Sequence, residues 1–211
     1  MAKLYFLGGE NVAKRDSIEI NEAAFLDAGE TPNVVVFPWA KASFDQAYKR
    51  RKRLFDYFRS LGACNVEFVA YSDTYEEINR KVECADLIYL PGGLASVLVE
   101  RLENKNVDTL LRGYDGVVVG RSAGALALGK KCVVTRNRRH PTSKMIRGIG
   151  LVGFSVKAHY KHSKDKALKR LSKEEKIYAI PERSALVYDD GCLSFMGDVY
   201  LFENGEKALA D

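Results

Sequence analysis

Residues 116–129 read Gly-Val-Val-Val-Gly-Arg-Ser-Ala-Gly-Ala-Leu-Ala-Leu-Gly and join two runs with opposite structural preferences. The β-branched run at 117–119 is typical of a strand covered on both faces, whereas 123–128 contains only small residues and strong helix formers. The pattern predicts a buried strand, a sharp turn at Ser122 and a helix. In this Gly-x-Ser-x-Gly arrangement, Gly120 and Gly124 would let the strand and the helix pass close together and expose the serine hydroxyl at the end of the sheet.

Ser122 has two interpretations. A serine that opens a helix is often an ordinary N-cap, and Gly-x-Ser-x-Gly also occurs by chance. The strand-turn-helix context favours the second interpretation, in which Ser122 is a nucleophile. The helix N-terminus would supply free N–H groups where an oxyanion forms. We expect the N–H groups of Ala123 and of Gly93, in the glycine-rich turn Pro-Gly-Gly at 91–93, to form the oxyanion hole.

Length and composition favour one domain that spans residues 1–211, because 211 residues with 46% hydrophobic content can bury a full core. No run approaches the roughly 18 apolar residues of a membrane span, and the first residues resemble a strand more than a signal peptide. We therefore expect a cytoplasmic protein without a membrane partner. The four cysteines are far apart and form no Cys-x-x-Cys pair, which favours reduced thiols. We expect no metal site and no cofactor.

The net charge of +5 includes five consecutive cations at 49–53, which could bind nucleic acid or an acidic surface. Apolar residues recur at helical spacing between Phe44 and Phe58, which favours a run that lies on the solvated face of an amphipathic helix. We do not expect nucleic acid as a partner. The sequence leaves a homodimer open.

The order of elements predicts an α/β fold. Strands are expected at 3–7, 34–37, 66–69, 87–90 and 117–119, and helices at 17–28, 44–61, 74–84 (started by Ser72 or Asp73) and from the 91–93 turn to about 102. This alternation predicts a three-layer sandwich whose mainly parallel sheet has helices on both faces. After residue 132 the expected elements are shorter, with strands near 133, 156, 177, 186, 193 and 200 and a helix near 168. These later strands predict an antiparallel C-terminal edge.

Three histidines could act as the base for Ser122: His140, His159 and His162. His140 lies in a basic stretch that resembles a loop, and His162 lies three residues beyond the end of an expected strand. His159 directly follows that strand, at 154–158. If the strand runs parallel to the others, it brings His159 to the sheet edge where ligands collect.

Three motifs together resemble the family of serine peptidases that includes dipeptidase E and cyanophycinase. They are Leu-Pro-Gly-Gly at 90–93, Gly-Arg-Ser-Ala-Gly-Ala at 120–125, and a downstream strand that ends in Ala-His-Tyr. The resemblance covers nearly the whole chain. It implies a fold similar to class I glutamine amidotransferases, with a flavodoxin-like core, in which Ser122 matches the nucleophile and His159 the general base.

In this family a third residue completes a catalytic triad by orienting the histidine, and here the sequence departs from the family pattern. Dipeptidase E has an aspartate between nucleophile and histidine, and cyanophycinase has a glutamate, but no carboxylate lies between Ser122 and His159 here. Asn137 falls where the aspartate is expected, and Glu182 could approach from another loop. We expect one of the two to bind the ring nitrogen that faces away from Ser122, and we favour Asn137 because its position follows the family's spacing.

The resemblance also implies a substrate. Dipeptidase E acts on short peptides with an N-terminal aspartate, whose side chain requires a cation. Four arginines are candidates, Arg121, Arg136, Arg138 and Arg139. We therefore expect a serine dipeptidase that acts on small acidic peptides. The alternatives are a binding or regulatory protein that has lost turnover on the same scaffold, and a nucleic-acid module that uses residues 49–53.

Overall fold

The computed structural model describes residues 1–41, 48–136 and 142–210. Its larger sheet has seven strands in the order β11-β10-β1-β5-β4-β2-β3. Strands β1 to β5 pair in parallel, while β10 and β11 continue the sheet in antiparallel pairing beyond β1. The strands are β1 (Lys3–Leu7), β2 (Asn33–Val36), β3 (Asn65–Phe68), β4 (Leu87–Leu90), β5 (Val117–Arg121), β10 (Ala185–Asp189) and β11 (Cys192–Met196).

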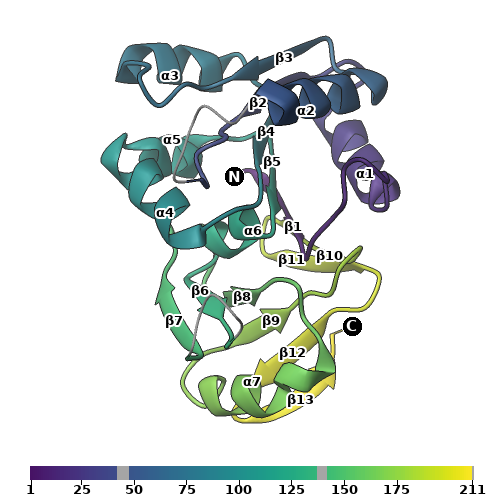
Figure 1. Ribbon diagram of the computed structural model, residues 1–211, viewed down its shortest axis with the longest axis vertical. Helices are drawn as coiled ribbons and strands as arrows, with labels where there is room; N and C mark the ends of the chain where they lie inside the picture. The colour runs from purple at the N-terminus through teal and green to yellow at the C-terminus, as the bar shows by residue number, and fades with distance from the viewer. Residues whose placement is uncertain (42–47, 137–141, 211) are drawn as a thin grey trace.

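Helices cover both faces of this sheet (Figure 1). They are α1 (Ile18–Ala28), α2 (Tyr48–Ser60), α3 (Tyr75–Glu83), α4 (Ala95–Asn104), α5 (Val107–Gly113) and α6 (Ala123–Leu128). Helices α1 and α2 share one hydrophobic cluster with the sheet, and α3 to α6 share the other. The predicted α/β class, with a mainly parallel sheet between helices and an antiparallel C-terminal edge, is confirmed.

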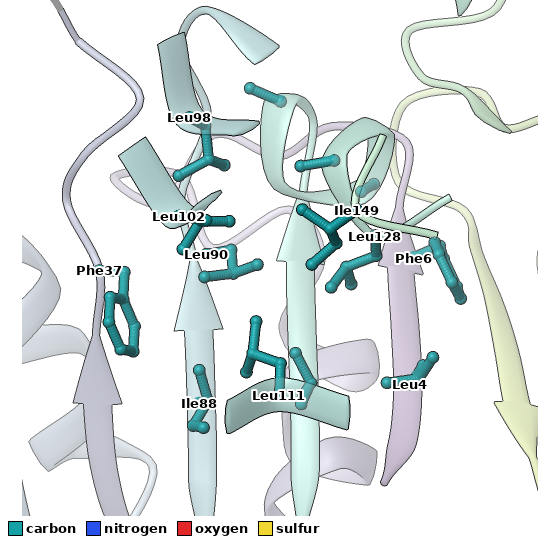
Figure 2. Packing of buried hydrophobic residues seen from close by; sticks show 14 of the residues in the cluster. Leu4, Phe6, Phe37, Ile88, Leu90, Leu98, Leu102, Leu111, Leu128 and Ile149 are labelled. Carbon is teal, nitrogen blue, oxygen red and sulfur yellow. The ribbon is translucent and has the colours of Figure 1, made fainter. Parts of the chain in front are cut away.

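Alternate residues of the buried strands explain why both faces need helices. Leu4 and Phe6 of β1 belong to one cluster, and Tyr5 and Leu7 belong to the other. Figure 2 shows the first cluster, in which leucines of α4, α5 and α6 pack over the apolar side chains of β4 and β1. None of the helices in the described ranges is long and apolar enough to span a bilayer.

A second sheet, in the lower part of Figure 1, has six strands in the order β13-β12-β9-β8-β6-β7 and is mostly antiparallel. Its strands are β6 (Lys131–Val134), β7 (Lys144–Arg147), β8 (Ser155–Lys157), β9 (Ile177–Ala179), β12 (Tyr200–Glu203) and β13 (Glu206–Leu209). A 3-10 turn, η2 (His162–Lys164), and helix α7 (Asp165–Leu171) follow β8. A separate second sheet was not predicted from the sequence.

Several element boundaries also differ from expectation. Helix α3 begins after Thr74, which forms a capping box with Glu77, and Ser72 and Asp73 are not its cap. Helix α5 and strands β7 and β13 were not predicted. The expected helix at 44–61 is described from Tyr48 to Ser60, and its first residues, 44–47, lie outside the described ranges.

Candidate active site

Ser122 lies at the junction of β5 and α6 with backbone angles φ 55° and ψ −105°. A non-glycine residue in this region stores roughly 1–3 kcal/mol of strain, which the surrounding packing must hold. The glycines on either side permit that packing. A Cβ on Gly124 would lie 2.1 Å from the carbonyl oxygen of Leu90, and one on Gly120 would lie 2.7 Å from the amide nitrogen of Ala125.

The hydroxyl of Ser122 is 2.6 Å from Nε2 of His159. His159 follows β8, which pairs with β6 and β9 in the second sheet. The expected route, in which the strand before His159 joins the main parallel sheet, is therefore wrong, although the histidine still arrives beside Ser122. Its backbone is held at this place because its N–H donates to the carbonyl of Gly8, 2.8 Å away.

The other ring nitrogen of His159, Nδ1, is 2.5 Å from Oε1 of Glu182. Glu182 lies in the loop between β9 and β10. With a proton on Nδ1 donated to this carboxylate, Nε2 has a free lone pair to accept the serine hydroxyl. Both side chains are about half exposed to solvent. Asn137, the favoured orienting residue, lies outside the described residues, as does His140.

His162 lies apart from this arrangement. Its Nδ1 is 3.0 Å from the hydroxyl of Tyr160 and 2.9 Å from Nζ of Lys207. Lys207 also forms an ion pair with Asp165 at 3.0 Å. These contacts link η2 and the start of α7 to β13, so His162 has a structural role in the second sheet.

Gly8 and Gly9 connect the two sheets at the site. A Cβ on Gly8 would lie 1.8 Å from the carbonyl oxygen of Pro181, and one on Gly9 would lie 2.5 Å from Cε1 of His159 and 2.6 Å from Oε2 of Glu182. The carbonyl of Gly9 accepts the N–H of Arg183 at 3.0 Å. The missing side chains therefore let the loops that carry His159 and Glu182 lie directly against the end of β1.

A cavity of about 280 Å³ opens beside Ser122. Both expected oxyanion-hole residues, Gly93 and Ala123, line it. Ala123 is the first residue of α6, so its N–H has no partner within the helix. Gly93 passes so close to the chain at Ala40 that a Cβ would lie 2.2 Å from the Ala40 carbonyl oxygen. The other lining residues are Leu94, Ala95, Ser96, Leu126, Val133, Val134, Thr135, Lys144, Ile146, Lys157, Ala158 and His159.

The expected arginines do not line this cavity where the structure describes them. Arg121 is half-buried and donates to the carbonyl of Glu10 at 3.5 Å. Arg136 is exposed, and its N–H donates to the hydroxyl of Ser143 at 2.9 Å. Arg138 and Arg139 lie outside the described residues.

Two lysines line the cavity instead, and neither was predicted from the sequence. Lys144 is exposed, whereas Lys157 is buried. Burial disfavours the charged form and the nearby cation Lys164 adds repulsion, so the pKa of Lys157 falls to about 8. The sequence did offer a signal for Lys157, because it is a charged residue inside the apolar strand that ends just before His159.

A model of peptidase family S51 matches residues 4–196 of this chain. The structure of a peptidase from an acI-B1 Actinobacterium is similar, with a TM-score of 0.74 and 20% identity over 100% of this chain and 94% of that chain. A candidate peptidase E protein from Listeria monocytogenes EGD-e has a TM-score of 0.71 and 19% identity over 93% of this chain and 98% of that one. A search of curated proteins gives no match. Because the family match extends over most of the sequence, this chain belongs to peptidase family S51.

Proposed function

We propose that this peptidase is a serine-type dipeptidase that hydrolyses short peptides, with preference for an acidic N-terminal residue. The observation that supports it most is the continuous series of contacts from the Ser122 hydroxyl through the His159 ring to the Glu182 carboxylate. Nucleophile, base and orienting acid within hydrogen-bond distance are the arrangement that acyl transfer requires.

In this proposal, Nε2 of His159 removes the hydroxyl proton as Ser122 Oγ attacks the peptide carbonyl. The N–H groups of Gly93 and Ala123 stabilise the oxyanion of the tetrahedral intermediate. Protonated His159 then donates the proton to the leaving amine, and an acyl-enzyme remains. Water, deprotonated by the same nitrogen, releases the acid product. Glu182 keeps the ring in the productive tautomer and stabilises the imidazolium.

The size and charge of the cavity support a small acidic substrate. A volume of about 280 Å³ lies just below the range of roughly 300–1,000 Å³ for small-molecule sites. This favours a dipeptide over a long chain. The side chains of Lys144 and Lys157 make the charged part of the lining positive, which suits a substrate that carries carboxylates.

Hydrolysis of a dipeptide panel tests the proposal. Asp-Leu, Glu-Leu, Ala-Leu and Lys-Leu are incubated with the wild-type protein and with Ser122→Ala, and the released leucine is quantified. We expect turnover of Asp-Leu above that of the others, and no turnover of any by Ser122→Ala. Equal rates for wild type and Ser122→Ala would exclude the serine mechanism. Peptide binding by a wild-type protein that hydrolyses none of the four would favour a binding or regulatory protein.

A further inference from the structure

Lys157 is the buried cation of the candidate active site. It is only 8% exposed and lines the same cavity as Ser122 and His159. In β8, Val156 belongs to the hydrophobic core, and the alternation of side chains along a strand directs Lys157 to the opposite face. The lysine is therefore held by a short buried strand two residues before His159.

No carboxylate in the described ranges pairs with this ammonium group. Its Nζ donates to the carbonyl oxygen of Ala158. The charged side chain that interacts electrostatically with it is Lys164, a second cation that repels it. Two other shielded lysines, in contrast, each have a carboxylate partner. Lys81 lies 2.8 Å from a carboxylate oxygen of Asp73, and Lys207 lies 3.0 Å from one of Asp165.

Burying a charged ammonium without a counter-ion is costly, and such groups in folded proteins are generally paired. An uncharged side chain such as methionine could fill the space that the Lys157 side chain occupies, without that cost. The bond to Ala158 leaves two of the three ammonium protons for other acceptors. A bound anion in the cavity would supply both the acceptors and the missing negative charge.

We propose that Lys157 determines specificity by binding a carboxylate of the peptide substrate in the cavity beside Ser122. That the bound molecule is a substrate rests on the proposed dipeptidase function, whereas the carboxylate site does not. Lys144, exposed on the same lining, adds positive potential but is solvated. A dipeptide offers two carboxylates of the same chemistry, the side chain of an acidic N-terminal residue and the C-terminal carboxylate.

Calorimetric binding in a Ser122→Ala background tests the site without turnover. The four ligands are Asp-Leu, Ala-Leu and the C-terminal amides of both, so each carboxylate is present and absent in turn. We expect Lys157→Met to weaken binding by roughly 10- to 100-fold for ligands that carry the recognised carboxylate, and by less than about 3-fold for ligands without it. Lys161→Met, an exposed lysine that does not line the cavity, is the matched control and should change nothing.

The pattern of losses identifies the carboxylate. If Lys157→Met weakens both aspartyl ligands, Lys157 binds the side chain; if it weakens both free acids, Lys157 binds the C-terminus. Equal affinities with and without Lys157 for all four ligands would overturn the proposal, and so would a failure of every ligand to bind. Circular dichroism and urea denaturation establish that Lys157→Met is folded, and Lys157→Gln replaces it if it is not.

The same variants separate this proposal from the proposed function. If the wild-type protein hydrolyses peptides and Lys157→Met leaves the relative kcat/KM values of Asp-Leu, Ala-Leu and their two amides as they are in wild type, the peptidase stands and the lysine site fails. If no peptide is hydrolysed but carboxylate binding depends on Lys157, the site stands and the dipeptidase proposal fails.

Discussion

Within the proposed triad, Glu182 departs most from the order that the resemblance implied, because it follows the histidine in the chain. Its Oε1 is 2.5 Å from Nδ1 of His159. A carboxylate at this place holds the imidazole in one tautomer and stabilises the imidazolium, whereas an amide carries no charge and, because its NH2 group can donate to the ring, also permits the wrong tautomer. The two candidates for this role therefore give opposite mutational results.

Glu182→Gln should lower kcat/KM for a dipeptide by about 10²- to 10⁴-fold, since it removes the negative charge opposite the imidazolium. Asn137→Asp should change kcat/KM by no more than a few-fold. Steady-state kinetics of both purified variants provide the comparison. The assignment of Glu182 would be wrong if Glu182→Gln kept wild-type turnover while Asn137→Asp raised it.

The buried Lys157 should make the free energy of unfolding depend on pH. Its folded-state pKa of about 8 lies below the ordinary 10.5, so between these pH values the unfolded chain binds more protons than the folded one. The destabilising effect of the buried charge is complete below pH 8, shrinks as pH rises, and is absent above about 10.5. Lys157→Met should thus be more stable than wild type by up to about 3 kcal/mol at pH 7, and the difference should decline towards pH 10. Urea denaturation at several pH values measures it, and a pH-independent difference would contradict this assignment.

At the scale of elements, the β5–α6 unit could be predicted from the sequence, but β8 could not be placed. In β5–α6 the β-branched run, the glycines and the helix formers all favour the same local structure. Strand β8 has three residues, Ser155–Lys157, and so short a strand has no periodicity that identifies its sheet. Its partners β6 and β9 lie far away in the chain, and that pairing is decided by packing.

The loop after β1 provides a test of how closely the two sheets must approach. In Gly9→Ala the three atoms nearest to the new Cβ would belong to the side chains of His159 and Glu182, which can move away. We expect the free energy of unfolding to change by less than about 1 kcal/mol, while kcat/KM falls by about 10²-fold because the base is displaced.

Gly153→Ala is the control for this change, because nothing lies within 4 Å of its Cβ position and its φ is not positive. It should keep wild-type kinetics and stability. Full activity of Gly9→Ala would show that the contact between the first loop and the histidine is not needed.

At the scale of the molecule, the candidate site lies where two sheets meet, and Phe154 is central to that contact. Its ring centroid is 5.7 Å from that of Phe6 in the main sheet and 4.8 Å from that of Tyr178 in the second sheet. Phe154 directly precedes β8. The same aromatic residue therefore stabilises the molecule and supports the strand that leads to His159.

Phe154→Ala should lower the free energy of unfolding by roughly 3–5 kcal/mol, as expected for a large buried aromatic side chain, and should also reduce turnover at temperatures where the protein remains folded. Phe55→Ala, on a side chain that is 42% exposed, is the control and should cost little. Chemical denaturation and kinetics of both variants measure the two effects. Wild-type stability of Phe154→Ala would show that the sheets are held together elsewhere.

The residues of the site differ in how far the sequence could identify them. Ser122 and His159 each lie next to a recognisable buried strand, so their local context was informative. Glu182 could be named from the sequence only as an alternative to Asn137, and its contact with His159 becomes visible only when the position of the loop after β9 is known. Lys157 was missed, because the sequence does not show which side of β8 lines the cavity. Their roles depend on contacts between segments distant in the chain, which spacing along the sequence does not encode.

Labelling with a fluorophosphonate tests the catalytic proposal most directly, because this probe reacts with a serine only when a neighbouring base activates it. Intact mass and peptide mapping should detect one adduct per chain, on the peptide that contains Ser122. The adduct should be absent in Ser122→Ala and strongly reduced in His159→Ala. A folded wild-type protein that gives no adduct, or an adduct that persists in Ser122→Ala, would contradict the assignment of Ser122 as the nucleophile.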